Sequence, residues 1–168
     1  MPATKKKSPA SVSRHPLFTT IRGEHDEVRK FFKQFEKEKN APEEAHTAAM
    51  TILGELIGHA EREESIFYPA LKERDEKLFH EAHEEHRVAK QLIAELQQGD
   101  PDETFNAKMK VLNDVIEHHI EEEYEQVFPA MRGLLREQLD EMAERWSAAK
   151  LGRVPTAVRE GTRRRRSA

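Results

Sequence analysis

Residues 118–129 read HHIEEEYEQVFP, and residues 59–69 read HAEREESIFYP. In each segment a histidine stands four residues before a glutamate, and an aromatic residue and a proline close the segment. An offset of sixty residues superimposes these positions, with His59 on His119, Glu63 on Glu123 and Pro69 on Pro129. Residues four apart lie on the same face of an α-helix, one turn from each other. The repetition predicts two helices that each turn an imidazole and a carboxylate in one direction and end near the proline.

The composition excludes several kinds of site. The 168 residues contain no cysteine, which excludes disulfides, iron–sulfur clusters and thiolate zinc sites. Apolar runs are only a few residues long, so we expect no segment to span a membrane. No apolar stretch follows the first lysines, as it would in a secretory signal. We therefore expect a cytoplasmic protein.

Positive charge is concentrated at the two ends of the chain. Residues 1–16 hold four Lys or Arg and no acid, and residues 150–168 hold seven with one Glu, so a net charge of −4 leaves −14 on the middle. This pattern predicts a folded body between a disordered basic tail at 1–15 and a disordered Arg-rich tail at 151–168. The arginines at 163–166 could meet nucleic acid. Isolated charge runs are usually solvated, however, so we expect no nucleic-acid partner.

Apolar residues recur at steps of three and four along four stretches, and no stretch alternates with period two. The apolar members of these stripes are Phe18, Ile21, Val28, Phe32 and Phe35; Ala45, Ala49, Ile52, Leu56, Ile66 and Ala70; Phe79, Ala82, Ala89, Ile93 and Leu96; and Phe105, Met109, Leu112, Ile116, Val127 and Ala130. Four helices with short links predict an all-α fold, an antiparallel up-down-up-down four-helix bundle over residues 16–132. A shorter fifth helix is predicted within 133–150, with Leu135, Leu139, Met142 and Trp146 on one face. It would lie across the bundle or contact another subunit.

Six polar residues interrupt these inward stripes: His25, His59, Glu63, His86, His119 and Glu123. Burying an unpaired carboxylate costs on the order of several kcal/mol, so their placement requires compensation. Residues 23–36 also align with residues 84–97, so the first two helices look like a copy of the last two. Helical rise brings the six residues to a common depth. Two equivalent half-sites suggest two metal ions, and the alternative is a metal-free layer of hydrogen-bonded groups.

The same stripes separate these six residues from their neighbours. Four further polar residues fall beside the inward line and are expected to flank the site: His83, His118, Glu64 and Glu122. Three other histidines are expected in loops or on the surface: His15, His46 and His80. Four imidazoles and two carboxylates without sulfur suit iron, manganese or zinc.

This pattern resembles the hemerythrin-like family, the HHE cation-binding domain, over about residues 15–132. The family motif H…HxxxE…H…HxxxE is matched by His25, by HAERE at 59–63, by His86 and by HIEEE at 119–123. The FYP and VFP endings are also similar to the family's. The resemblance implies the hemerythrin four-helix bundle and, as cofactor, two iron ions in a non-haem, oxo- or hydroxo-bridged centre.

The sequence departs from the oxygen-carrying hemerythrins at two positions. Where their third helix has HxxxH, Ala82 stands four residues before His86; where their fourth has HxxxxD, Tyr124 stands five residues after His119. One iron would then have one histidine fewer. Tyr124, His83 or water could take the free position.

An open ferric pair suits peroxide better than reversible oxygen carriage. The variant motif therefore predicts catalase-like disproportionation of hydrogen peroxide, with Glu64 or Tyr124 shuttling protons. The alternative is sensing or storage of oxygen, nitric oxide or iron without turnover, with the fifth helix or the arginine tail reporting to a partner. A ferritin-like site is disfavoured because its pair of Glu-x-x-His motifs is missing.

Overall fold

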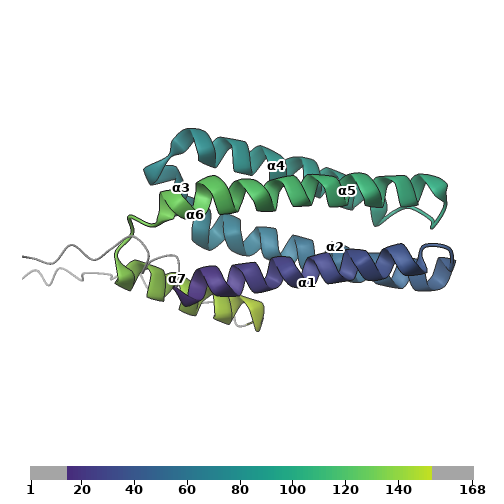
Figure 1. Ribbon diagram of the computed structural model, residues 1–168, viewed down its shortest axis with the longest axis horizontal. Helices are drawn as coiled ribbons and strands as arrows, with labels where there is room; N and C mark the ends of the chain where they lie inside the picture. Colours follow the sequence, from purple (N-terminus) through teal and green to yellow (C-terminus); the bar gives the residue numbers. More distant parts are fainter. Residues whose placement is uncertain (1–14, 153–168) are drawn as a thin grey trace, which may run out of the picture.

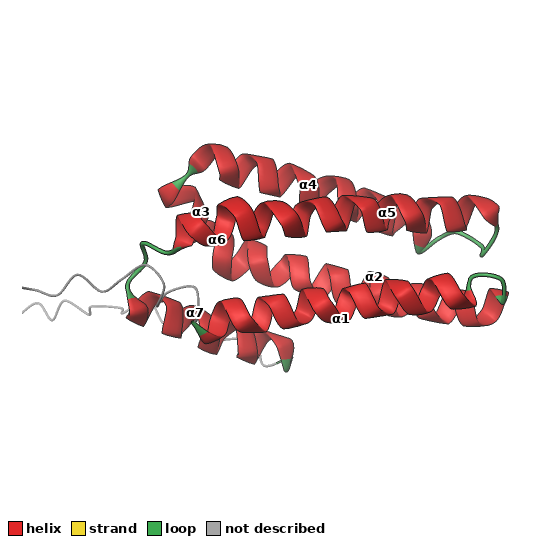
Figure 2. Ribbon diagram, viewed as in Figure 1, coloured by secondary structure: helices red, strands yellow, loops and turns green. Residues whose placement is uncertain are grey.

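The computed structural model describes residues 15–152, and every regular element among them is a helix (Figure 2). The predicted all-α class is therefore confirmed. The predicted tails at 1–15 and 151–168 lie outside the described residues, except for one residue of the first and two of the second. Within the described range no helix is long and apolar enough to cross a membrane. The cytoplasmic location stays a prediction.

The long helices run along a common axis and are α1 (Pro16–Glu38), α2 (Pro42–Arg62), α4 (Glu76–Leu96) and α5 (Glu103–Glu122). The shorter helices are α3 (Tyr68–Arg74), α6 (Phe128–Met131) and α7 (Arg136–Lys150). In Figure 1 the α1–α2 and α4–α5 connections lie at one end, and the α3–α4 connection lies at the other. Helix α1 packs on α2, and α4 packs on α5. The chain thus forms two helical hairpins side by side.

Side-chain caps fix where three of the long helices begin. The carboxylates of Asp75 and Asp102 accept a backbone N–H from the first turn of α4 and α5, at 3.0 and 2.7 Å. His15 caps α1, because its Nδ1 accepts the N–H of Leu17 at 3.2 Å while its Nε2 lies 2.9 Å from Asp140 of α7. His15 is consequently buried. His15 thus stands in the non-helical segment before α1, one of the two places expected for it, but it is not on the surface because its imidazole ties α1 to α7.

Both HxxxE segments continue into a π-helical turn that begins at the glutamate. These turns are η2 (Glu63–Phe67) and η3 (Glu123–Val127), and in each the next residue donates its N–H to the carbonyl of the glutamate, five residues back. Pro69 and Pro129 follow, and the chain stays helical beyond them as α3 and α6. The prolines therefore do not end the helices as expected. The wider turn accommodates a ring that would clash with the carbonyl four residues earlier in an α-helix.

Each π turn adds one residue and so shifts the buried stripe. All predicted apolar residues of the four long stripes are buried except Ala70, Phe79 and Ala130, which are half-buried. Beyond the two turns the buried positions are instead Phe67, Leu71, Phe128 and Met131. At the start of α4 the buried residue is Leu78 rather than its neighbour.

The core consists of two apolar clusters with the six polar residues between them along the helices. One cluster lies toward the α1–α2 and α4–α5 connections and includes Val28, Phe32, Phe35, Ile93 and Leu112. The other lies toward the opposite end and includes Phe18, Ile21, Phe67, Leu71 and Trp146. Apolar side chains therefore flank the polar layer on both sides along the axis of the long helices.

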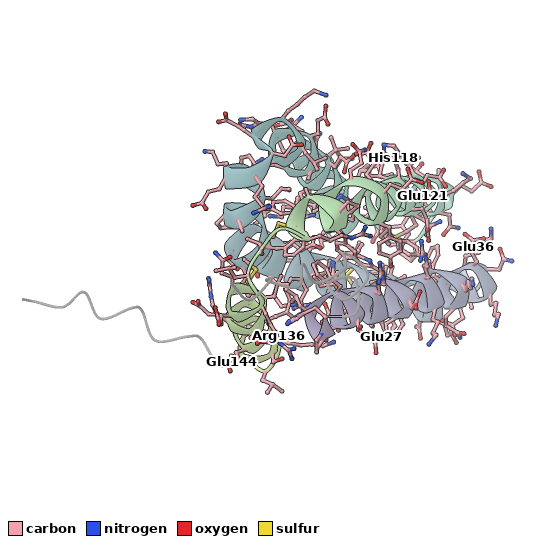
Figure 3. The ribbon with its side chains drawn as sticks, turned by 60° about the vertical axis from the view of Figure 1, so that its left-hand side comes forward. Glu27, Glu36, His118, Glu121, Arg136 and Glu144 are labelled. Carbon is pink, nitrogen blue, oxygen red and sulfur yellow. The ribbon has the colours of Figure 1, made fainter. Side chains whose placement is uncertain are left out.

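Helix α7 lies along the first hairpin (Figure 1) and packs against α1, α2 and η2. It buries Leu139 and Trp146, whereas Leu135 is 64% exposed because it stands at the N-cap position. Figure 3 shows charged and polar side chains on the outer faces, among them Glu27, Glu36, His118, Glu121, Arg136 and Glu144. Helix α7 therefore packs on the helices of its own chain, which was one of the two positions predicted for it. The other, a contact with a second subunit, stays a prediction.

Candidate metal centre

The structure brings together all six polar side chains that were predicted to face inward. They come from α1 (His25), α2 and η2 (His59 and Glu63), α4 (His86), and α5 and η3 (His119 and Glu123). All six are buried, and both glutamates are 0% exposed. Their donor atoms form two groups, each with atoms within 4.8 Å of one another. We call the group containing His25 and His59 the first half-site and the group containing His86 and His119 the second half-site.

The first half-site has four possible donors. The Nε2 atoms of His25 and His59 lie 2.9 Å apart. His25 Nε2 is 3.2 Å from Glu123 Oε2, and His59 Nε2 is 3.0 Å from Glu63 Oε1. The HxxxE spacing produces this contact, because it stacks His59 and Glu63 one turn apart on the same face of α2.

The second half-site mirrors the first and shares a carboxylate with it. The Nε2 atoms of His86 and His119 lie 3.1 Å apart, and Glu63 Oε2 lies 3.1 and 3.7 Å from them. Glu63 thus turns one oxygen toward each half-site. That is the arrangement expected of a carboxylate that bridges two ions.

The carboxylate oxygens provide a direct test of whether a cation fits. Both oxygens of Glu63 and both oxygens of Glu123 are buried, and none of them accepts a hydrogen bond within the described residues. Imidazole nitrogens lie as close as 3.0 Å but not in the direction of a hydrogen bond. Buried carboxylates are normally paired or bound to a metal. The convergent Nε2 atoms and these oxygens therefore fit metal ions better than a self-satisfied polar layer.

Each of the four imidazoles has a hydrogen-bond partner at Nδ1, the ring nitrogen that points away from the half-site. The Nδ1 atoms of His25, His59, His86 and His119 lie 3.0, 2.8, 3.1 and 2.8 Å from Tyr124, Glu24, Glu64 and Glu85, respectively. A partner at Nδ1 leaves Nε2 available and fixes the plane of the ring. Such partners are typical of histidines that bind metals.

The two residues expected to shuttle protons, Glu64 and Tyr124, belong to this outer ring. Glu64 bonds Nδ1 of His86 and also accepts from Lys90 Nζ at 2.6 Å. The Tyr124 hydroxyl bonds Nδ1 of His25, on the side of the ring that faces away from the second imidazole. Both side chains are therefore placed to orient histidines.

The pKa shifts show that a positive charge is stabilised beside the buried glutamates. Burial and the His59 charge lower the pKa of His25 to about 3. Burial would also lower the pKa of His59, but the carboxylates of Glu63 and Glu24 outweigh it and raise that pKa to about 9. Burial and the Glu63 charge raise the pKa of Glu123 well above its ordinary value. The site thus favours cationic charge between its carboxylates.

Sequence reasoning missed three residues of this site: Glu24, Glu85 and Tyr68. The two glutamates directly precede His25 and His86, so the internal repeat itself could have identified them. Tyr68 is buried, stacks on the His86 ring and places its hydroxyl 3.1 Å from His86 Nε2. It belongs to the FYP ending and reaches the site because η2 turns it inward.

The remaining histidines do not join the two half-sites. His83 and His80 are exposed on α4, and His46 is half-buried beside Phe105. His118 is exposed next to Glu85, with its Nε2 3.6 Å from that carboxylate.

A comparison with protein-family models matches residues 17–131 to the hemerythrin HHE cation-binding domain. The chain belongs to the hemerythrin HHE family. The match covers all six inward residues and both π turns of this HHE domain. Family members bind metal cations, as the name of the domain states, and the buried His and Glu groups provide the donors for them.

A relative of this HHE protein is a DNA nickase from Nostoc sp. (strain PCC 7120 / SAG 25.82 / UTEX 2576). The two sequences are 29% identical over 136 residues, which cover 77% of this chain and 38% of the nickase. This chain thus spans little more than a third of that relative. No solved structure shows significant similarity to the chain.

Proposed function

We propose that this HHE protein is a non-haem di-iron protein that binds O2 or hydrogen peroxide and disproportionates the peroxide. Its two ions would be held inside an antiparallel up-down-up-down four-helix bundle. The observation that carries the proposal is Glu63, which directs one oxygen to each pair of histidines. A carboxylate placed in this way supports two ions rather than one.

The proposed ligands are the four imidazoles at Nε2, with Glu63 bridging and Glu123 closing the first half-site. Nitrogen and carboxylate donors without sulfur suit iron in both of its common oxidation states. Two iron ions would supply the two-electron exchange that peroxide chemistry needs. The two glutamates offset part of their charge.

A small cavity beside the histidines supports a ligand with two oxygen atoms. It has a volume of about 30 Å³ and is lined by all four ligand histidines and by apolar residues that include Val28, Leu56, Ile93 and Ile116. A water molecule needs roughly 10–15 Å³ by this measure, so the space holds about two oxygen atoms. Its apolar lining favours O2 or H2O2 over a charged substrate.

Disproportionation converts two peroxide molecules into one O2 and two water molecules. One peroxide loses two electrons and two protons, and the second takes them up as its O–O bond breaks. The Tyr68 hydroxyl lies 3.1 Å from His86 Nε2 in the second half-site, and burial raises the pKa of its phenol well above the ordinary value, so it stays protonated. We assign Tyr68 to donate the proton, while Glu64 and Tyr124 hold His86 and His25 in position.

The test is iron analysis of the purified chain, followed by oxygen release from hydrogen peroxide by the iron-loaded protein. We expect about two irons per chain and O2 release above a free-iron control. His86→Asn should lower both, whereas the exposed His83→Asn should lower neither, which also tests whether His83 is a ligand. Absence of metal would overturn the di-iron proposal. Two irons without O2 release, together with a reversible oxygen adduct of the diferrous protein, would favour oxygen binding or sensing.

The name of the Nostoc relative suggests DNA as another substrate, but the acidic middle of this chain does not favour it. The middle of the chain carries −14, and more than half of the nickase lies outside the match. Phosphate contacts require clustered Lys and Arg. The arginines at 163–166 lie outside the described residues. We expect no strand breaks when supercoiled plasmid is incubated with the protein and a chelator.

A further inference from the structure

We infer that α7 positions one half of the proposed metal centre. Trp146, acting through Glu24, holds His59 and makes the first half-site bind its ion more tightly than the second. The inference rests on the proposed function, because it concerns the same pair of ions. It adds a difference in affinity between the two metal ions, which the repeated sequence motif alone does not predict.

The starting point is an element that the two halves share. Glu24 precedes His25, and Glu85 precedes the equivalent histidine of the repeat. Each glutamate accepts a hydrogen bond from Nδ1 of the histidine in the neighbouring HxxxE motif, at 2.8 Å in both halves. The repeat thus provides both half-sites with the same supporting carboxylate.

The surroundings of these two carboxylates differ. Glu24 is 6% exposed, and besides His59 it receives Arg62 at 2.7 Å, the indole Nε1–H of Trp146 at 3.1 Å and Lys150 at 3.1 Å. Two of these donors come from α7. Every hydrogen-bonding direction of the Glu24 carboxylate is therefore occupied.

Glu85 has no such support. The sixty-residue offset that relates the halves places Glu122 where Arg62 stands in the first half. Glu85 is about 20% exposed, and besides His119 the groups beside it are Glu122 and the exposed His118, whose Nε2 lies 3.6 Å from the Glu85 carboxylate. A cation in one half is thus replaced by an acid in the other, and no segment corresponding to α7 covers it within the described residues.

Trp146 is placed to hold His59 rather than merely to fill space. It is fully buried, and its ring meets the His59 ring edge-to-face with centroids 5.5 Å apart. The guanidinium of Arg62 also lies over the indole ring, 5.3 Å from its centroid. The helix that carries it is anchored separately. Arg145 donates to the Ser65 carbonyl in η2 at 3.1 Å, and this carbonyl is the one that Pro69 cannot pair in an α-helix.

This asymmetry has a consequence for metal affinity. The partner at Nδ1 fixes the orientation of a ligand imidazole and raises its basicity, and loss of such a partner typically lowers metal affinity by about 10- to 100-fold. The first half-site also has four donors within 4.8 Å, whereas the second has three. The first ion should therefore bind more tightly and exchange more slowly than the second.

The experiment is a cobalt(II) titration of the metal-free full chain, followed by visible absorption and by calorimetry. Cobalt accepts the same donors as ferrous iron. Wild-type protein should bind two equivalents in two separable steps. Trp146→Phe, which keeps an apolar ring but loses the N–H, should weaken the tight step by about 10-fold or more and leave the weak step unchanged. Glu24→Gln should weaken the same step, and the double variant should be no weaker than Glu24→Gln alone, because Trp146 acts through Glu24.

Two control variants separate positioning from general stability. Leu139→Ala truncates a buried apolar side chain of α7 that cannot form a hydrogen bond with Glu24, so it should lower the melting temperature without changing the ratio of the two affinities. Glu85→Gln should weaken the other step. Equal weakening of both steps by Trp146→Phe, or no change in either, would overturn the inference while leaving two bound ions intact. A wild-type chain that binds no cobalt would instead overturn the proposed function and this inference with it.

Discussion

Replacing Glu123 by leucine should change the stability of the metal-free and metal-loaded proteins in opposite directions. Glu123 is fully buried, and neither of its oxygens accepts a hydrogen bond within the described residues. Burial and the Glu63 charge raise its pKa well above 4.5. The folded metal-free chain therefore binds more protons at this carboxyl than the unfolded chain does. Stability is consequently lost as pH rises above about 4.5, and this cost is present at pH 7.

Leucine has a similar volume and carries no charge, so the substitution removes this cost. Replacement of buried ion pairs by apolar groups of similar volume is often neutral or stabilises a protein by about 1–4 kcal/mol, and we expect a gain within this range here. For a chain of this length each kcal/mol corresponds to a change in melting temperature of roughly 2–4 °C. His25 keeps its contact with His59 at 2.9 Å, and burial lowers its pKa to about 3, so no unpaired charge is left behind.

In the metal-loaded protein the same substitution removes a ligand. Wild-type protein at metal concentrations about 1,000-fold above Kd should gain roughly 4 kcal/mol of stability, and Glu123→Leu should lose most of that gain together with at least one bound ion. The assay is thermal unfolding at pH 7, with chelator and with iron, combined with metal analysis. Glu121→Leu, at an exposed position two residues away, is the control. A metal-free variant less stable than wild type, with unchanged metal content, would refute the reasoning and favour a purely structural polar layer.

Three further predictions concern other parts of the molecule. Tyr68→Phe should leave the iron content unchanged and lower peroxide turnover by about 10-fold or more, as is typical for loss of a proton donor; equal turnover would exclude Tyr68 from proton transfer. Arg29→Met should lower the free energy of unfolding by about 1 kcal/mol or less in urea titrations, because its bidentate pair with Glu117 joins α1 to α5 but is about 30% exposed. A loss of several kcal/mol would show that this pair is more than a surface contact. Acidification from pH 7 to pH 5 in the absence of chelator should release metal, since imidazole must be neutral to bind it, and metal analysis after desalting at each pH measures this release.

Much of the fold and of the candidate site could be predicted because helical periodicity is a local property. The stripes identify which side of each helix is buried, and His25, His86 and the two HxxxE pairs stand on those sides. Aspartates at helix starts act through neighbouring backbone N–H groups, so they too are visible locally. The internal repeat adds the pairing of the two halves, and the structure shows that repeat again in the matching bounds of η2 and η3.

Other features could not be predicted because they depend on partners distant in the chain. The π turns move the buried stripe by one residue at Ala70 and Ala130, and a pattern built on 3.6 residues per turn does not anticipate the extra residue. His15 is buried only because α7 returns to it with Asp140. The hydroxyl of Tyr68 reaches His86 only through the turn that precedes it.

By itself the sequence determined that this protein is helical and that two histidine–glutamate motifs and two further histidines share its interior. Spacing along one chain is enough for that, since it decides which face of a helix each side chain occupies. Only the tertiary structure decided that Glu63 faces both half-sites, that each imidazole is held at Nδ1 and that α7 supports one half alone. These features arise from contacts between residues as far as 122 positions apart, and such contacts are set by how helices pack rather than by the order of residues within them.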